Sequence, residues 1–148
     1  AVAADLLTGE VVVLREGSVA RAVRASCSVP GIFMPVEQGE RLLVDGGVLN
    51  NLPVSVAREM GADYVIAVDL LPPIQRTRQP RHLAEMWMLA YYSLVLLAHR
   101  ERSDADCLII PDIAHLSIMD FSRRLELIAK GREAAEAALP QLREDLRL

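Results

Sequence analysis

One acidic residue followed by two glycines is the strongest chemical signal in this sequence. Asp45 comes directly after the apolar residues 42–44 and before Gly46 and Gly47, a pattern that predicts a strand, a sharp turn and then a helix. Because ligands of open α/β sheets bind at the carboxyl ends of strands, Asp45 is our candidate catalytic residue, a base that accepts a proton from a nearby hydroxyl. The competing interpretation is a plain turn, which Asp-Gly often forms.

The nucleophile that such a base would activate is not evident in the sequence. No G-x-S-x-G motif, the turn that exposes a serine nucleophile, occurs in the 148 residues. Ser26 and Ser28 lie in a turn rich in small residues that no strand enters, and Cys27 is no better a candidate. Asp69, which also ends a predicted strand, is the second carboxylate in a position suited to function.

The histidines and cysteines do not form a recognisable site. His82 and His99 lie near the ends of a predicted long helix and His115 lies in a loop, so we expect solvated or structural roles for all three. No pair of histidines has metal-ligand spacing, and Cys27 and Cys107 lie far apart. We therefore expect no metal and no cofactor, and reduced cysteines typical of a cytoplasmic protein.

Apolar runs predict the elements that hold these residues. Residues 2–7 and 10–14 should form a hairpin around Thr8-Gly9, Ser18 should cap a helix, and Asn50 or Asn51 should cap the helix that begins near Pro53. Strands are predicted at 42–44, 64–70 and 107–110, and helices at 19–25, 53–60, 81–103 and from residue 120 or 122 to the C-terminus. Alternating strands and helices predict an α/β fold with a mostly parallel sheet flanked by helices, including a βαβ crossover between residues 44 and 65.

Size, composition and charge exclude several classes of protein. A chain of 148 residues that is 52% hydrophobic suits one domain with a sizeable core. The net charge of −4 and the scarcity of aromatic residues argue against a nucleic-acid partner. Residues 86–98 are almost all apolar but would span only about 20 Å as a helix, short of the roughly 30 Å membrane core. We expect them to be buried; the alternative is a wall of an acyl-chain site or a surface that meets a membrane.

Several segments, all in the same order, carry a recognisable pattern. They are residues 5–10, 22–33, 44–47, 50–53, 61–69, 110–112 and 119–121. Together they resemble the patatin-like phospholipases, of the bacterial type related to the neuropathy target esterase domain. The resemblance implies a three-layer α/β/α fold and a serine acyl hydrolase of phospholipase A, lysophospholipase or esterase type. Such an enzyme cleaves lipid ester bonds through a Ser–Asp dyad, without histidine.

The same resemblance assigns roles to residues of this chain. Asp45 matches the aspartate of the family's D-G-[GA] motif, with Gly46 and Gly47 supporting the turn, and would accept the proton of the serine hydroxyl. The family's serine and oxyanion loop belong to the amino-terminal part of its domain and have no counterpart here. We therefore expect residues 1–148 to be the carboxyl-terminal portion of a single patatin-like domain, incomplete at its amino-terminal side and inactive alone.

Partners and alternatives follow from these expectations. The expected partners are a lipid or ester substrate and the amino-terminal segment of the same domain, with peripheral membrane contact and oligomeric state left open. A non-catalytic binding or interaction module with the same fold is the main alternative. A nucleotide-binding α/β domain is the weaker one, because no G-x-G-x-x-G or P-loop is present and Asp45 would repel a phosphate.

Overall fold

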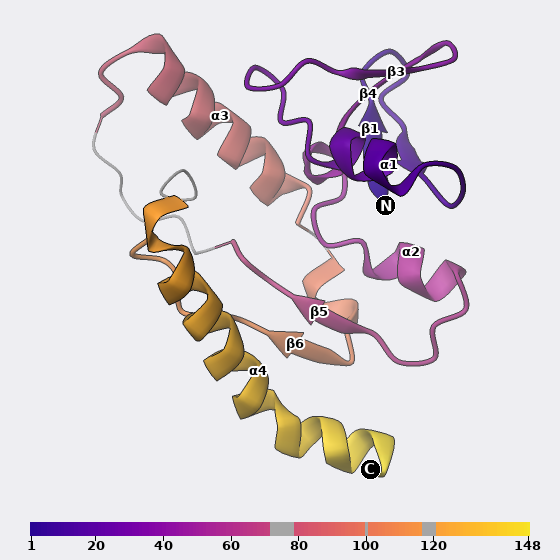
Figure 1. Ribbon diagram of the computed structural model, residues 1–148, viewed down its shortest axis with the longest axis vertical. Coiled ribbons are helices and arrows are strands. Elements are labelled where there is room, and N and C mark those ends of the chain that lie inside the picture. The colour runs from indigo at the N-terminus through magenta and orange to yellow at the C-terminus, as the bar shows by residue number, and fades with distance from the viewer. Residues whose placement is uncertain (72–78, 100, 117–120) are drawn as a thin grey trace.

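The chain contains both strands and helices, with two pairs of consecutive strands in its first part and alternation of helices and strands after β4. The computed structural model describes residues 1–71, 79–99, 101–116 and 121–148 (Figure 1). Its elements are β1 (Val2–Asp5), β2 (Val11–Val13), α1 (Val19–Ser26), β3 (Val36–Gln38), β4 (Arg41–Asp45), the 3-10 turn η1 (Gly46–Val48), α2 (Val54–Glu59), β5 (Ile66–Val68), α3 (Leu83–Leu97), η2 (Glu101–Asp104), β6 (Cys107–Ile109), η3 (Phe121–Arg123) and α4 (Arg124–Leu146). Met119 and Asp120, which belong to the last resembling segment, lie outside the described residues.

The larger sheet is antiparallel, which corrects the prediction of a mostly parallel sheet for the part of the chain that is described. Its strand order is β2-β1-β4-β3. Ala3 on β1 pairs with Val12 on one side and with Asp45 on the other, and β3 and β4 form a hairpin. Short apolar runs bounded by turns occur in both kinds of sheet, so the sequence pattern alone did not distinguish them.

The first hairpin turns at Thr8-Gly9 as predicted and is held by a buried carboxylate. Asp5 Oδ1 accepts hydrogen bonds from the N–H groups of Leu7 and Leu42, both at 3.1 Å, and Oδ2 accepts from the Thr8 hydroxyl at 3.2 Å. Gly9 supplies the positive φ of 72° that closes the turn. Asp5 therefore fixes both the β1–β2 turn and the neighbouring strand β4.

Helix α1 packs against the larger sheet and closes the first hydrophobic core. Ser18 caps it as predicted, since its hydroxyl accepts a hydrogen bond from the Arg21 N–H. The buried side chains of this core come from α1 and from three strands; they are Ala3, Val12, Ala25 and Leu43. β4, the strand that ends in Asp45, therefore has β1 and β3 as its neighbours in the sheet and α1 packed against it.

A second, smaller unit contains the only parallel pairing among the described strands. β5 and β6 pair in parallel, with Ala67 opposite Leu108. Its core is formed by Leu52, Val54, Val65 and Ala67. The predicted crossover between residues 44 and 65 is wrong, because β4 and β5 belong to different sheets.

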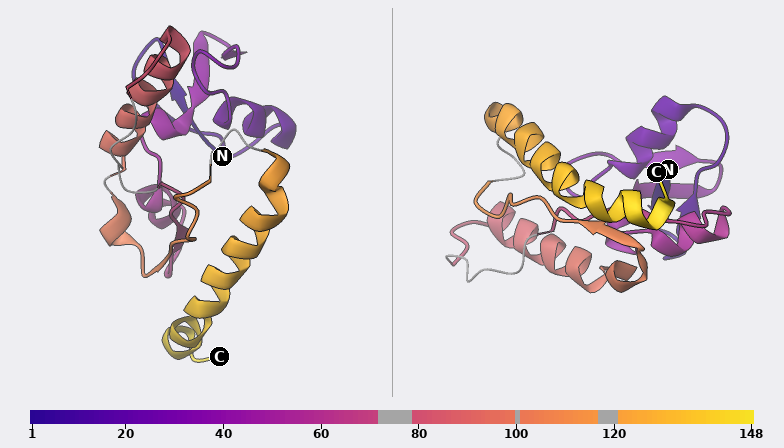
Figure 2. Two further views of the ribbon diagram at one scale, coloured as in Figure 1. Left: turned by 90° about the vertical axis from the view of Figure 1, so that its left-hand side faces the viewer. Right: turned by 90° about the horizontal axis from the view of Figure 1, so that it is seen from below.

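The two longest helices lie on opposite sides of the β5–β6 pair (Figure 2). The predicted helix at 81–103 is shorter, since α3 ends at Leu97. The prediction that it is deeply buried is also wrong for most of its length: among its residues, Tyr91 and Val95 are buried. α4 contacts β6 but buries no residue fully. No helix in the described ranges combines the length and the apolar character needed to cross a membrane.

Candidate active site

Asp45 ends strand β4 with its carboxylate folded back onto the turn that follows. Its Oδ1 accepts a hydrogen bond from the Gly47 N–H at 2.8 Å, and its own N–H donates to the Ser28 carbonyl at 3.0 Å. The small-residue turn at 26–31 therefore lies directly beside the aspartate, a contact that the sequence did not predict. These bonds fix both the backbone and the carboxylate of Asp45.

Close contacts around the turn explain why glycines follow Asp45, which the sequence could only suggest. A Cβ on Gly46 would lie 2.6 Å from the backbone oxygen of Val2, on strand β1. A Cβ on Gly47 would lie 2.9 Å from Asn51 Oδ1 and 3.0 Å from Asp45 Oδ1. Carbon and oxygen do not approach this closely without displacement, so a side chain at Gly46 would push the β1 backbone away, and one at Gly47 would displace the Asn51 and Asp45 side chains. The catalytic role of Asp45 itself stays a prediction.

Helix α3 covers the site and brings a hydroxyl to it. The Trp87 indole N–H donates to the Pro30 carbonyl at 3.0 Å, which docks α3 on the turn at 26–31. One turn further along, the Tyr91 hydroxyl donates to the Asp45 carboxylate. Gly31 is required below the indole, because its φ is 83° and a Cβ would lie 2.6 Å from Trp87 Nε1. α3 is therefore a wall of the Asp45 site.

Burial decides the acid–base properties of this pair. Desolvation raises the pKa of Asp45 above its ordinary value, while the hydrogen bonds from Gly47 and Tyr91 partly oppose the rise. Burial, followed by the negative charge of Asp45, strongly raises the pKa of Tyr91. Tyr91 is thus a neutral donor at physiological pH and Asp45 is a stronger base than a solvated aspartate. That is the direction a general base requires.

The serine nearest to Asp45 along this turn has its hydroxyl engaged elsewhere. Ser28 is fully buried, its hydroxyl donates to the Arg24 carbonyl at 2.6 Å, and it accepts from the Arg24 guanidinium. Cys27, beside it, is exposed. The Ser28 hydroxyl is therefore engaged by Arg24, and these contacts do not direct it toward Asp45.

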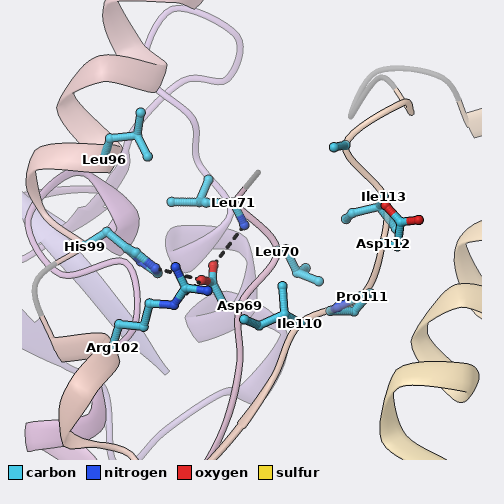
Figure 3. A pocket seen from close by; sticks show the side chains of 11 residues that line it. Asp69, Leu70, Leu71, Leu96, His99, Arg102, Ile110, Pro111, Asp112 and Ile113 are labelled. Carbon is cyan, nitrogen blue, oxygen red and sulfur yellow. Dashed lines mark hydrogen bonds and ion pairs between the residues drawn. The ribbon is translucent and has the colours of Figure 1, made fainter. Parts of the chain in front are cut away.

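Asp69, the second carboxylate singled out by the sequence, lines a pocket of about 420 Å³ (Figure 3). Asp69 is 1% exposed, and its Oδ2 lies 3.1 Å from His99 Nε2 and 3.2 Å from Arg102 Nε. Its Oδ1 accepts from the Leu71 N–H at 3.0 Å. The remaining walls are mainly apolar; they include Leu70, Leu96, Ile110, Pro111 and Ile113.

His99 contributes to this site in a way that its position in the sequence does not indicate. A structural role was expected, and the imidazole is indeed buried, with only 8% of its side chain exposed. What the sequence could not indicate is that it joins Asp69 to the segment after the Asp-Gly-Gly turn, because Asn51 Nδ2 lies 3.3 Å from its other nitrogen. The sequence feature that pointed to this site was the position of Asp69 at the end of a predicted strand.

The other histidines take the expected surface roles. His82 caps α3, with its Nδ1 accepting from the Glu85 N–H at 3.3 Å, and His115 lies 3.1 Å from Glu126. Within the described residues, no three His, Cys, Asp or Glu side chains cluster in a way that could hold a metal ion.

Similar proteins match both the Asp45 region and the rest of the chain. The family model described as patatin-like phospholipase matches residues 5–58, which contain Asp45, Gly46 and Gly47. An NTE family protein of Mycobacterium tuberculosis is 35% identical over 98% of this chain and 29% of its own length.

Two eukaryotic proteins are similar to smaller parts of this chain. The patatin-like phospholipase domain-containing protein 7 of Mus musculus is 44% identical over 47% of this chain and 5% of its own length. Lysophospholipase NTE1 of Chaetomium globosum is 28% identical over 82% of this chain and 10% of its own length. The chain thus spans less than a third of the length of each of these relatives.

Proposed function

Since the chain belongs to the patatin-like phospholipase family, in the group related to the NTE proteins, we propose that it carries the acidic half of a lipid acyl hydrolase site. Asp45 is the base of a Ser–Asp dyad, and Gly46 and Gly47 form the turn that holds it. The observation that carries the proposal is the half-buried Asp45 carboxylate, which has a raised pKa and accepts a hydrogen bond from a hydroxyl.

The proposed reaction moves one proton through Asp45 in each half. The serine oxygen attacks the ester carbonyl carbon as its proton passes to Asp45, and a tetrahedral oxyanion forms. The C–O bond to the alcohol then breaks, and Asp45 returns the proton to the departing alkoxide. Water repeats the sequence on the acyl-enzyme and releases the fatty acid, so Asp45 ends unprotonated, as it began.

The serine and the oxyanion donors of this site lie outside the 148 residues in the proposal. The chain contains no G-x-S-x-G segment, and a missing oxyanion donor alone typically lowers the rate by about 10²–10³. The chain by itself should therefore not turn over esters. Lipid esters reside in membranes, so peripheral contact with a lipid surface belongs to the same proposal.

The test compares the chain alone with the protein made from its full reading frame. Hydrolysis of a short-chain p-nitrophenyl ester and of a lysophospholipid is measured for the parent, for Asp45→Asn and for Asp63→Asn. Asp63 is an exposed control carboxylate. We expect Asp45→Asn to lower kcat on the order of 10³-fold or more and Asp63→Asn to leave it unchanged. Retention of activity in full-length Asp45→Asn would refute the proposal.

A non-catalytic binding module is the second candidate, favoured by the absence of G-x-S-x-G from the 148 residues. A full reading frame that also lacks this motif, and that fails to react with a fluorophosphonate probe, would support the module. Covalent labelling of a serine by the probe would support the hydrolase.

A further inference from the structure

The segment that follows helix α3 holds the residues just after the Asp-Gly-Gly turn. Three side chains of this segment, His99, Glu101 and Arg102, are here called the clamp. Each contacts a different polar group: His99 faces Asn51, Glu101 binds Asn50, and Arg102 reaches Asp69. The clamp thus connects the loop that carries Asp45 with the Asp69 pocket.

Glu101 takes the capping role that the sequence assigned to the asparagines. Its Oε2 accepts from the Ser55 N–H at 2.7 Å, and its Oε1 accepts from the Ser55 hydroxyl at 2.8 Å and from Asn50 Nδ2 at 2.9 Å. The first turn of α2 and the Asn50 side chain are therefore held by one carboxylate. Asn51 is left available for a different contact.

The chemistry of Asn51 assigns the tautomer of His99. Asn51 Nδ2, 3.3 Å from His99 Nδ1, is an amide nitrogen and can only donate, so Nδ1 must accept. A neutral imidazole then carries its hydrogen on Nε2, which lies 3.1 Å from Asp69 Oδ2. This is an electrostatic contact and not a hydrogen bond, since neither atom has a hydrogen-bond partner in the described part of the chain. A carboxylate beside the second ring nitrogen commonly fixes the tautomer and orientation of a histidine. Asp69 therefore orients His99 to accept from Asn51.

Asn51 in turn lies against the Asp45 turn. Its Oδ1 is close enough to Gly47 that a Cβ there would lie only 2.9 Å away, and the Gly47 N–H is the donor that holds the Asp45 carboxylate. We infer that His99, oriented by Asp69, is a positioning residue: by holding Asn51 it fixes Gly47 and hence the direction of Asp45. This inference rests on the proposed function, which gives Asp45 its role.

The experiment measures amide hydrogen exchange by NMR on the chain, in which the Gly47 amide reports the Gly47–Asp45 hydrogen bond. Four forms are compared: the parent, His99→Leu, His99→Gln and His115→Leu. Glutamine offers an acceptor oxygen to Asn51 and leucine does not. His115→Leu removes a half-exposed histidine distant from the clamp in sequence. The amides of strand β4 serve as the internal reference for global opening.

We expect His99→Leu to accelerate exchange of the Gly47 amide about tenfold, as loss of roughly one hydrogen bond predicts, with the β4 amides unchanged. His99→Gln should stay within about twofold of the parent, and His115→Leu should match it. Equal acceleration of Gly47 and β4 would mean a general structural role and would overturn the inference. So would an unchanged Gly47 amide in His99→Leu, or the absence of rescue by His99→Gln.

A second variant covers the case in which His99→Leu does not fold. Asn51→Ala removes the same link from the loop side and should accelerate Gly47 exchange to a similar extent. Slow Gly47 exchange in this variant would overturn the inference. The amide readout requires no turnover, so a failed hydrolysis assay would remove the proposed function and leave this result intact. In an active full-length protein, His99→Leu should lower kcat with little change in KM, because it misdirects Asp45 and does not touch the substrate.

Discussion

Tyr91, on helix α3, donates its hydroxyl hydrogen to the carboxylate of Asp45, at the end of strand β4. This contact joins a helix with few buried residues to the glycine turn that follows β4. An ionised carboxylate offers about four acceptor positions, and Gly47 and Tyr91 together use two of them. Asp45 therefore keeps the capacity to accept a further hydroxyl, as a dyad requires.

Removal of the Tyr91 hydroxyl should raise the pKa of Asp45 further. The hydrogen bond from Tyr91 lowers the pKa of this half-buried carboxyl, so Tyr91→Phe removes a stabilising contact of the ionised form. We also expect a loss of roughly 1 kcal/mol of stability. A ¹³C-carboxyl NMR titration measures the shift, and Tyr92→Phe, on the same helix, is the control. A lower Asp45 pKa in Tyr91→Phe would contradict the assigned donor.

The stability of Asp45→Asn should depend on pH in a defined direction. The pKa of Asp45 is raised in the folded chain, so ionisation costs more in the fold than in the unfolded chain. Below the unfolded pKa near 3.8 both states are protonated, and the penalty appears as pH rises through the higher folded pKa. The free energy of unfolding of Asp45→Asn, relative to the parent, should therefore be greater at pH 7 than at pH 3. Urea titrations at both values measure this; the opposite order would refute it.

Asp5 should show the reverse dependence. Burial raises its pKa, but the N–H groups of Leu7 and Leu42 and the Thr8 hydroxyl outweigh burial, so the net shift is downward. The stability it contributes is present above pH 3.8 and is lost as pH falls through the lowered folded pKa. Asp5→Ala should lower Tm at pH 7, with a deficit that shrinks below pH 3. Thr8→Val, which removes one donor, should show a smaller deficit. A deficit that is constant across this range would argue against the assignment.

Replacement of Gly46 by alanine should destabilise the chain, whereas the same replacement of a glycine in a helix should stabilise it. Gly46→Ala would press a methyl group against the Val2 backbone oxygen, which we expect to cost about 1–3 kcal/mol. Gly131, in α4, has nothing within 4 Å of an added Cβ, so Gly131→Ala should stabilise the chain by roughly 0.5–1 kcal/mol. Thermal unfolding of both variants tests the contrast. Equal effects would contradict the close approach of β1 to the turn.

Exposed apolar side chains on α3 should cause the chain to associate. Met86 is 53% exposed and Leu97 is 65% exposed, and apolar surface of this kind favours contact with another apolar surface. The double variant Met86→Gln, Leu97→Gln should sediment with a smaller concentration dependence than the parent. Glu136→Gln, on the exposed side of α4, is the control. A parent chain that sediments as a monomer at all concentrations would refute the prediction.

Local chemistry was predictable from the sequence. The turn at Thr8-Gly9, the Ser18 cap and the Asp45-Gly46-Gly47 corner depend on residues within a few positions of one another. Side-chain hydrogen bonds and glycine geometry act over that range, so the residue types alone indicate them. The family resemblance could also be recognised from the sequence, because it depends on short motifs that occur in a fixed order.

Only the tertiary structure decided how these local pieces face one another. The direction of strand pairing and the exposure of α3 were decided by packing. The contacts of His99 and Glu101 join residues that lie 46 to 51 positions apart. Such contacts depend on which surfaces meet after packing, and hydrophobic periodicity does not record that choice. The sequence therefore determined that Asp45 sits at a glycine corner. Packing determined that a tyrosine contacts it and that a buried histidine, next to a second aspartate, contacts Asn51 in the segment that follows.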